Sequence, residues 1–400
     1  MSFTCGASDY GIAKGEKLIA FALLFRADQS MTIQGPSFEP SADSEPTPSR
    51  VRASARGDER PFVTIVVPCR NEEKRISKCL DSILANDYPK DRMEILVLDG
   101  MSEDRTREII ASYAQRFPRM RLVDNPQKHI PAAMNIGIRA ARGQRILKMD
   151  AHSTYQPGYI SRCVHYQDIY EAENVGGVLS MMPGSDTATA KAIVLGLGHR
   201  FGSGNANVKI GVDIPTWSDT AAFGCFRKEL FERIGMYDEH LLSSSDLDLN
   251  QRIQAAGGGI LVVPDVVVNY SADANLRTFW RHVFADGVWV SYVLKFGKKA
   301  WSWRHWVPAV FVLSLLTSFV LAALYPVFLW VGLGLAGLYA ATNFAVSLQI
   351  AVRERDLQFA FLLPIVFTVR HIVHGVGTLV GLILVALPGE HWKGRRSRKG

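Results

Sequence analysis

Three short apolar runs, each ending abruptly at a polar or acidic residue, constrain the fold of this chain more than any other feature. The runs cover residues 63–67, 95–98 and 146–149, and segments long enough for helices separate them. This pattern predicts buried strands of a mostly parallel sheet, and therefore an α/β fold. Ligands of such sheets bind beyond the carboxyl ends of the strands. We therefore expect the polar residues that follow the runs to face one pocket.

The C-terminal part of the chain is apolar enough to enter a membrane. Residues 307–350 contain no formally charged side chain. About 20 apolar residues span a bilayer, so this stretch predicts two membrane helices, divided near Tyr325 and Pro326. A large buried core is the alternative, but soluble cores seldom run so long without a charge.

A third apolar run, residues 357–387, is interrupted only by Arg370, His371 and His374. These residues are costly in lipid. They either grip the diphosphate of a lipid-linked substrate, form a transport or proton path, or mark a break that leaves 357–371 lying flat. Two spans would keep both basic segments of the chain on the cytoplasmic side, whereas three full spans would place the basic tail outside. The sequence leaves these alternatives open.

The basic character of the chain comes from two patches that flank the apolar region. Residues 391–400 and 277–304 together hold eleven Lys or Arg residues and one acid, Asp286, in a chain of net charge +7. The basic pI therefore does not indicate a nucleic-acid-binding surface. Five scattered cysteines without a CxxC spacing indicate a reducing compartment and neither a disulfide framework nor a thiolate zinc site.

These observations divide the chain into five parts. Residues 1–60 lack sustained periodicity and are expected to be a disordered extension. Residues 61–275 alternate strands and helices, with a looser, glycine-containing stretch that extends to Gly211, and a helix at 104–116 that Ser102 is expected to cap. A basic and aromatic interfacial segment (276–306), transmembrane helices (307–388) and a basic cytoplasmic tail (389–400) follow.

Several short motifs occur in a fixed order along residues 62–270. They are Pro68-x-x-Asn71-Glu72, Asp99-Gly100-x-Ser102, Asn135-x-Gly137, Asp150-Ala151-His152, and Asp246-x-Asp248 followed by Arg252. In this order they resemble family 2 of the inverting glycosyltransferases, and most of all the succinoglycan-type exopolysaccharide glucosyltransferases. The resemblance implies a GT-A-type fold: a Rossmann-like, mixed and mostly parallel sheet with helices on both faces, here followed by the C-terminal α-helical membrane region.

Sugar transfer from a nucleotide diphosphate requires that charge on the departing diphosphate be neutralised. Asp150 and His152 lie two residues apart just past a predicted strand, so both can turn toward a divalent cation. The family usually has a second aspartate at the position of His152. An imidazole there lowers the ligand charge and shifts the preference from Mg²⁺ toward Mn²⁺. The alternative is a loop histidine that bonds to the backbone.

The acceptor hydroxyl must also lose a proton, and we expect Asp246 to take it. Residues two apart on a helix point in different directions, so at most one of Asp246 and Asp248 faces the pocket. Asp246 shares a side with the apolar Leu249, whereas Asp248 lies four residues before Arg252 and can form an ion pair. The family position also implies that Asp246 is the general base, although Ser245 replaces the usual preceding Glu.

The resemblance implies a nucleotide-binding set at the first two strand ends. Asp99 and Glu72 can accept hydrogen bonds from uracil or ribose, Arg70 and Asn71 line the turn, and Pro68 and Asn135 complete the motifs; ordinary strand-end capping is the alternative. Arg281 and His282 resemble a shortened diphosphate-gripping segment, although Arg281 can instead contact lipid headgroups. The chain lacks the Gln-x-x-Arg-Trp sequence of chain-extending relatives, which favours single addition over a processive synthase.

The sequence thus predicts a membrane-bound, metal-dependent inverting transferase of the inner membrane, with its catalytic domain in the cytoplasm. It is expected to move a hexose, glucose from UDP-glucose, to a polyprenyl-diphosphate-linked oligosaccharide in exopolysaccharide or cell-surface polysaccharide biosynthesis. A membrane scaffold that binds nucleotide sugars without transfer is the non-enzymatic alternative, and a processive polysaccharide synthase is the enzymatic one.

Overall fold

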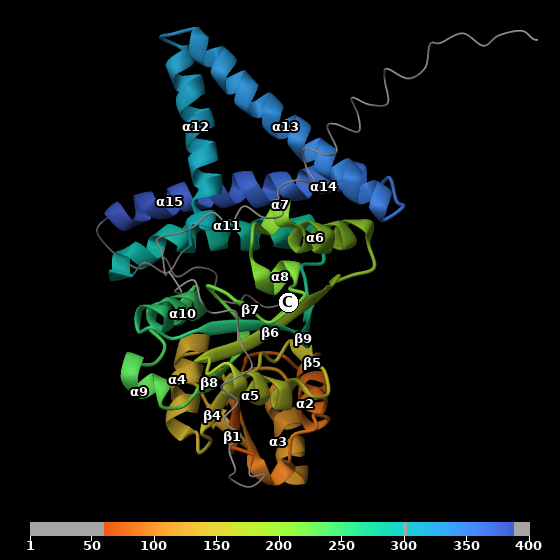
Figure 1. Ribbon diagram of the computed structural model, residues 1–400, viewed down its shortest axis with the longest axis vertical. Coiled ribbons are helices and arrows are strands. Elements are labelled where there is room, and N and C mark those ends of the chain that lie inside the picture. The colour runs from red at the N-terminus through yellow and green to blue at the C-terminus, as the bar shows by residue number, and fades with distance from the viewer. Residues whose placement is uncertain (1–59, 299–301, 388–400) are drawn as a thin grey trace, which may run out of the picture. The chain divides into compact units, whose positions relative to one another are not determined.

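The computed structural model describes residues 60–298 and 302–387. The expected N-terminal extension and the basic tail therefore lie outside the described residues, except for Arg60. The described region begins with a mixed sheet and ends with long apolar helices (Figure 1).

The sheet has the strand order β3-β2-β1-β4-β8-β6-β9-β5, with β7 paired to β9. Its first four strands in this order are parallel. Strand β8 runs antiparallel to β4 and β6, and β6 is parallel to β9. The strands are β1 (Val63–Cys69), β2 (Met93–Asp99), β3 (Met120–Asp124), β4 (Arg145–Lys148), β5 (Ser153–Tyr155), β6 (Asn174–Met182), β7 (Thr216–Trp217), β8 (Ala222–Arg227) and β9 (Ile260–Ser271). The three apolar runs thus end at one edge of the sheet, as predicted.

Helices cover both faces of this sheet, because each presents an apolar stripe to it. One face packs against α2 (Ile76–Leu84), α3 (Thr106–Arg116) and α5 (Tyr159–Ile169). The other face packs against α4 (Ile130–Ala140), α9 (Leu230–Ile234) and α10 (Ser245–Ala255). A short 3₁₀ turn, η1 (Lys90–Arg92), precedes β2. The predicted α/β class with helices on both faces is confirmed.

Two local predictions are wrong. The stretch expected to be loose contains α6 (Ala188–Gly198), α7 (Arg200–Ser203) and α8 (Asn207–Ile210), because its glycines permit close packing of short helices. Ser102 does not cap α3; the Oδ1 atom of Asp104 instead accepts a hydrogen bond from the backbone N–H of Thr106 at 3.0 Å. The hydroxyl of Ser102 accepts the backbone N–H of Asn71, in the neighbouring loop.

The C-terminal region consists of helices joined by short turns. Its elements are α11 (Leu276–Tyr292), η2 (Val293–Phe296), η3 (Trp303–His305), α12 (Val307–Ala322), α13 (Val327–Arg353), α14 (Phe359–Thr368), the π-helical η4 (Val369–Val373) and α15 (His374–Ala386). Three stretches, 303–322, 327–353 and 359–386, are long and apolar enough to cross a membrane. The division near Pro326 is confirmed. Helices α12 and α13 expose large apolar side chains, as lipid-facing helices do.

The third apolar run is not broken at its polar residues. Helices α14 and α15 are joined by a π-helical turn that contains Arg370 and His371, so the expected break in the helix at these residues is wrong. Helix α15 lies along α11 (Figure 1). Glycines permit this contact: a Cβ atom on Gly377 would lie 2.5 Å from the carbonyl oxygen of Phe284, and one on Gly381 would lie 2.4 Å from that of Val288. The small residues of Gly377-x-x-x-Gly381 therefore allow α15 to pack closely against α11.

Candidate active site

Asp246 pairs with a lysine that the motifs do not include, and Asp150 acts electrostatically on the same lysine. Lys148 is the last residue of β4, and its Nζ atom lies 2.6 Å from Oδ2 of Asp246 in the first turn of α10. Lys148 is 5% exposed, whereas half of the Asp246 side chain is accessible. Burial by itself would lower the pKa of Lys148, but Asp246 and Asp150 outweigh it and raise the pKa. The ends of β4 and α10 therefore meet at one charged cluster.

The neighbouring Asp248 forms the ion pair with Arg252 that their four-residue spacing predicts. Its Oδ2 atom lies 2.9 Å from Nη2 of Arg252, one helical turn later. Arg252 also donates to the carbonyl oxygens of Ile234 and Met236, at 2.7 and 2.9 Å. Asp248 thus holds α10 against the end of α9, while Leu249 on the Asp246 side is fully buried in the core. Of the two aspartates, Asp246 is the one with an accessible carboxylate.

Asp150 has a feature that suits a cation. Its Oδ1 atom is buried and accepts no hydrogen bond from the residues that the structure describes, which is costly unless a ligand pairs with it. His152, two residues on, stands edge-on to the Tyr270 ring at 5.5 Å. Burial raises the pKa of Tyr270 to about 12, and Asp150 is the first carboxylate to add to that shift. Asp150 and His152 thus flank the same tyrosine.

Asp150 and His152 by themselves would supply at most two ligands to a divalent cation. No group of three or more His, Cys, Asp or Glu side chains within 60–298 and 302–387 is close enough to hold a metal ion without further ligands. A carboxylate and an imidazole leave most positions open, as expected when a substrate diphosphate supplies the remaining oxygens.

The turn after β1 is tied to the turn after β2. Asn71 has a left-handed backbone conformation (φ 56°), and its Oδ1 atom accepts the backbone N–H of Glu103 at 2.9 Å. Arg70 lies over Gly100, because a Cβ atom there would come within 3.2 Å of the Arg70 side chain. The Oε2 atom of Glu72 lies 3.5 Å from the Nη1 atom of Arg75, and burial raises the pKa of Glu72. Arg70, Asn71 and Glu72 therefore border the strand ends, and Pro68 lies within β1.

Two members of the predicted nucleotide-binding set are structural in this conformation. Asp99 is fully buried, and its carboxylate accepts hydrogen bonds from Ser102 and, at 2.6 Å, from Arg107. The alternative of strand-end capping therefore describes it. Asn135 is 4% exposed; it donates to the carbonyl oxygen of Tyr237 and accepts the N–H of Tyr237, both at 2.9 Å. It fastens α4 to the loop before α10, so neither side chain has a free group for a nucleotide.

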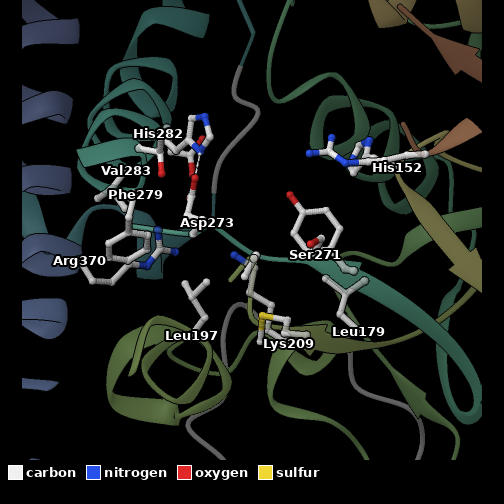
Figure 2. Close-up of a pocket in the computed structure, with 18 of the residues that line it drawn as sticks. His152, Leu179, Leu197, Lys209, Ser271, Asp273, Phe279, His282, Val283 and Arg370 are labelled. Atoms are coloured by element: carbon white, nitrogen blue, oxygen red, sulfur yellow. Dashed lines mark hydrogen bonds and ion pairs between the residues drawn. The ribbon is translucent and has the colours of Figure 1, made fainter. Parts of the chain in front are cut away.

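A cavity of about 820 Å³ opens beside His152 (Figure 2). Its walls come from the ends of β6 and β9 and from α6, α8, α11 and η4. Residues along its length include Glu72, His152, Tyr270, Lys209, Phe279 and Arg370. His282 lines it as well and pairs with Asp273 at 2.8 Å, whereas Arg281 is not among the lining residues. Of the predicted diphosphate pair, only His282 reaches this space.

Sequence reasoning missed Lys148 and Lys209. Lys148 had a usable signal: it lies two residues before Asp150 at the end of a strand, and alternate residues of a strand share a face. Lys209 had none, because α8 was not predicted and the lysine reaches the cavity only through the packing of α6, α7 and α8 beside β6.

Comparisons with known proteins agree with this geometry. Residues 64–235 match the glycosyl transferase family 2 model. The chain is 25% identical over 330 residues to a dolichyl N-acetyl-α-D-glucosaminyl phosphate 3-β-D-2,3-diacetamido-2,3-dideoxy-β-D-glucuronosyltransferase of Methanococcus voltae, covering 80% of this chain and 97% of that protein. It is 28% identical over 221 residues to the succinoglycan biosynthesis protein ExoA of Rhizobium meliloti, covering 54% of this chain and 66% of ExoA, slightly under two thirds.

Among solved structures, the chain is similar in fold to a mannosyltransferase of Pyrobaculum calidifontis, PcManGT, in complex with GDP-Man and Mn²⁺. The TM-score is 0.51 at 18% identity, with 80% of this chain and 88% of that chain covered. A likeness at this identity speaks to the fold, and it agrees with the GT-A-type sheet described above. Residues 64–235 are therefore similar to the family 2 glycosyltransferases in sequence, and the sheet topology agrees with the fold of that mannosyltransferase.

Proposed function

We propose that this chain is a membrane-bound, inverting glycosyltransferase that moves a hexose from a nucleotide sugar to a lipid-linked acceptor. The observation that carries the proposal is the charged cluster in which Lys148 pairs with Asp246 and is also influenced electrostatically by Asp150. It places a carboxylate with an unpaired buried oxygen in the same charged cluster as an accessible carboxylate that is paired with a buried lysine. These are the two charges that sugar transfer from a nucleotide diphosphate requires.

In the proposed reaction Asp246 acts on the acceptor. Its carboxylate takes the proton of the acceptor hydroxyl while the oxygen forms a bond to the anomeric carbon and the bond from that carbon to the diphosphate breaks. The ion pair of Lys148 with the Oδ2 atom of Asp246 orients this carboxylate. A single displacement inverts the anomeric centre. When bound, Mn²⁺ or Mg²⁺ on Asp150 and His152 would neutralise the diphosphate that leaves.

Glucose from UDP-glucose is the first donor to test, since ExoA is named for succinoglycan biosynthesis and the motifs resemble that group. Glu72, Arg70 and Asn71 are the proposed contacts to the nucleotide. A lipid-linked acceptor is supported by the name of the Methanococcus relative, a dolichyl phosphate glycosyltransferase, and by the three apolar helices. The catalytic domain then faces the cytoplasm, where nucleotide sugars are made.

The test is transfer by the full chain, purified in detergent, from a panel of labelled nucleotide sugars to a polyprenyl-diphosphate-linked sugar. We expect a lipid-extractable product with one sugar added, and loss of transfer with EDTA that Mn²⁺ restores. Asp150→Asn should lower kcat about a hundredfold or more. The matched control is Asp186→Asn, whose carboxylate is 93% exposed on the surface.

The outcomes separate the alternatives. Binding of a nucleotide sugar without transfer or release of the nucleotide, by any donor of the panel, would support the scaffold and contradict the enzyme. Products that lengthen by many sugars on one lipid would indicate a processive synthase. Transfer that persists in EDTA and in Asp150→Asn would overturn the assignment of the cation to Asp150 and His152.

A further inference from the structure

The cavity beside His152 ends in two cations. Lys209 reaches it from α8. Arg370 reaches it from η4 in the third apolar run, on the side opposite His152 (Figure 2). The other charged pairs on its wall are self-contained, since Glu72 pairs with Arg75 and Asp273 with His282. Lys209 and Arg370 form no ion pair with any residue in the described part of the chain. This part of the cavity therefore holds two cations that form no ion pair within the described residues.

Arg370 is held in place by one hydrogen bond. Its Nε atom donates to the carbonyl oxygen of Gly202, in α7, at 3.0 Å. This bond orients the guanidinium and leaves its two terminal nitrogens for a ligand. The next residue, His371, is fixed between the carbonyl oxygen of Phe201 at 2.8 Å and the Tyr339 hydroxyl at 3.1 Å. The sheet domain and the apolar helices thus fix Arg370 from both sides.

The like charges at this end of the cavity have an energetic cost. Burial, followed by Arg370, lowers the pKa of Lys209 to about 8. One carboxylate, that of Asp286 on α11, lines the same end and offsets part of the charge, but its side chain is exposed and it binds neither cation directly. A dianion would neutralise two poorly solvated cations. Phosphate is a dianion that lysine and arginine side chains bind together readily.

We propose that Lys209 and Arg370 bind the phosphate or diphosphate of the lipid-linked acceptor. The proposal rests on the proposed function and adds which residues hold this group and where. Arg370 belongs to an apolar helix, and Leu197, Phe279 and Val283 form an apolar wall at this end, as a lipid substrate needs. A phosphate bound here directs the sugar attached to it along the cavity toward His152 and the proposed donor site.

The experiment measures binding of polyprenyl diphosphate to the full chain in detergent micelles, with inorganic pyrophosphate and phosphatidylglycerol as the two comparison ligands. We expect Lys209→Gln and Arg370→Gln each to weaken binding of polyprenyl diphosphate about tenfold or more. Lys209→Arg should retain most of it. Asp286→Asn should strengthen it a few-fold, because it removes the opposing charge. The matched control is Lys191→Gln, an exposed lysine on α6 that pairs with Asp186.

The comparison ligands distinguish the sources of the phosphate. Pyrophosphate should compete weakly with polyprenyl diphosphate for the wild-type protein and should not compete for Lys209→Gln. Binding of phosphatidylglycerol should be the same in both proteins. Equal loss of both lipids would show a general headgroup contact and overturn the proposal. So would wild-type binding in Lys209→Gln, a variant that changes no hydrogen bond of the fold and so tests the site even if Arg370→Gln misfolds.

Transfer assays separate this proposal from the proposed function. Here the acceptor KM should rise about tenfold in Lys209→Gln, with the KM for the nucleotide sugar unchanged. If the wild-type protein transfers no sugar but binds the lipid, and Lys209→Gln weakens that binding, the site stands and the proposed function fails. If transfer proceeds with an unchanged acceptor KM in the variant, the function stands and the site fails.

Discussion

Replacing Asp246 by Asn separates the catalytic role of this carboxylate from its structural one. The substitution removes the base, so we expect kcat to fall by about 10²- to 10⁴-fold. It also leaves the ammonium of Lys148, which is 5% exposed, without its partner at 2.6 Å. Breaking a buried ion pair in this way costs about 3–5 kcal/mol.

The stability cost should be smaller here than for a fully buried pair. Half of the Asp246 side chain is accessible, so solvent screens the interaction, and Asp150 still lies near the orphaned lysine. We therefore expect Asp246→Asn to lower the free energy of unfolding by about 1–2 kcal/mol. Lys148→Met in the same chain removes the orphaned cation and should restore most of that loss without restoring turnover.

The assay combines thermal unfolding in detergent with initial rates of sugar transfer for both single variants and the double variant. Asp168→Asn is the matched control, because Asp168 is also half exposed and pairs with another residue of β4, Arg145, at 2.8 Å. It should cost a similar or smaller stability and leave turnover unchanged. Wild-type turnover in Asp246→Asn would refute the base assignment. A double variant no more stable than Asp246→Asn would refute the pairing argument.

Two further predictions concern the membrane side of the cavity. Gly381→Leu should push α15 away from α11, lower the free energy of unfolding by about 2 kcal/mol or more and weaken acceptor binding. Gly337→Leu is the control and should change neither, since a Cβ atom at this position of α13 has nothing within 4 Å. Thermal unfolding measures the stability, and lipid titration measures the binding. Because burial and Arg370 lower the pKa of Lys209 to about 8, this lysine is charged below pH 8 and loses its charge above it. Affinity for polyprenyl diphosphate should therefore fall by up to about tenfold between pH 7 and pH 9 and stay level in Lys209→Arg, with binding titrations at fixed ionic strength as the measurement.

The predictable parts of the fold are those in which local pattern and tertiary role coincide. The runs at 63–67, 95–98 and 146–149 are buried on both faces of a sheet, so their composition alone identifies them as strands. The pair Asp248 and Arg252 was predictable for a similar reason, because an i, i+4 spacing on a helix is itself a contact.

Some side chains are held by contacts that no periodic pattern predicts. Asp99 has the motif position of a ligand-binding acid, yet Ser102 and Arg107, three and eight residues later, bind its carboxylate. Asn135 is held by Tyr237, a hundred residues later. Such contacts leave no periodic trace in the sequence, so a motif cannot tell a ligand-binding side chain from one that fastens the walls of the site.

The proposed acceptor site joins the two halves of the molecule, and this explains why it escapes both motif and composition. Lys209 comes from the sheet domain and Arg370 from an apolar helix, and their separation depends on the contact between α15 and α11. Glycines set that contact, since a Cβ atom on Gly287 of α11 would lie 2.2 Å from the carbonyl oxygen of His374. A change at the helix contact should therefore alter acceptor binding without touching a ligand. If Gly381→Leu lowers stability but leaves the acceptor KM unchanged, the two cations do not act as one site.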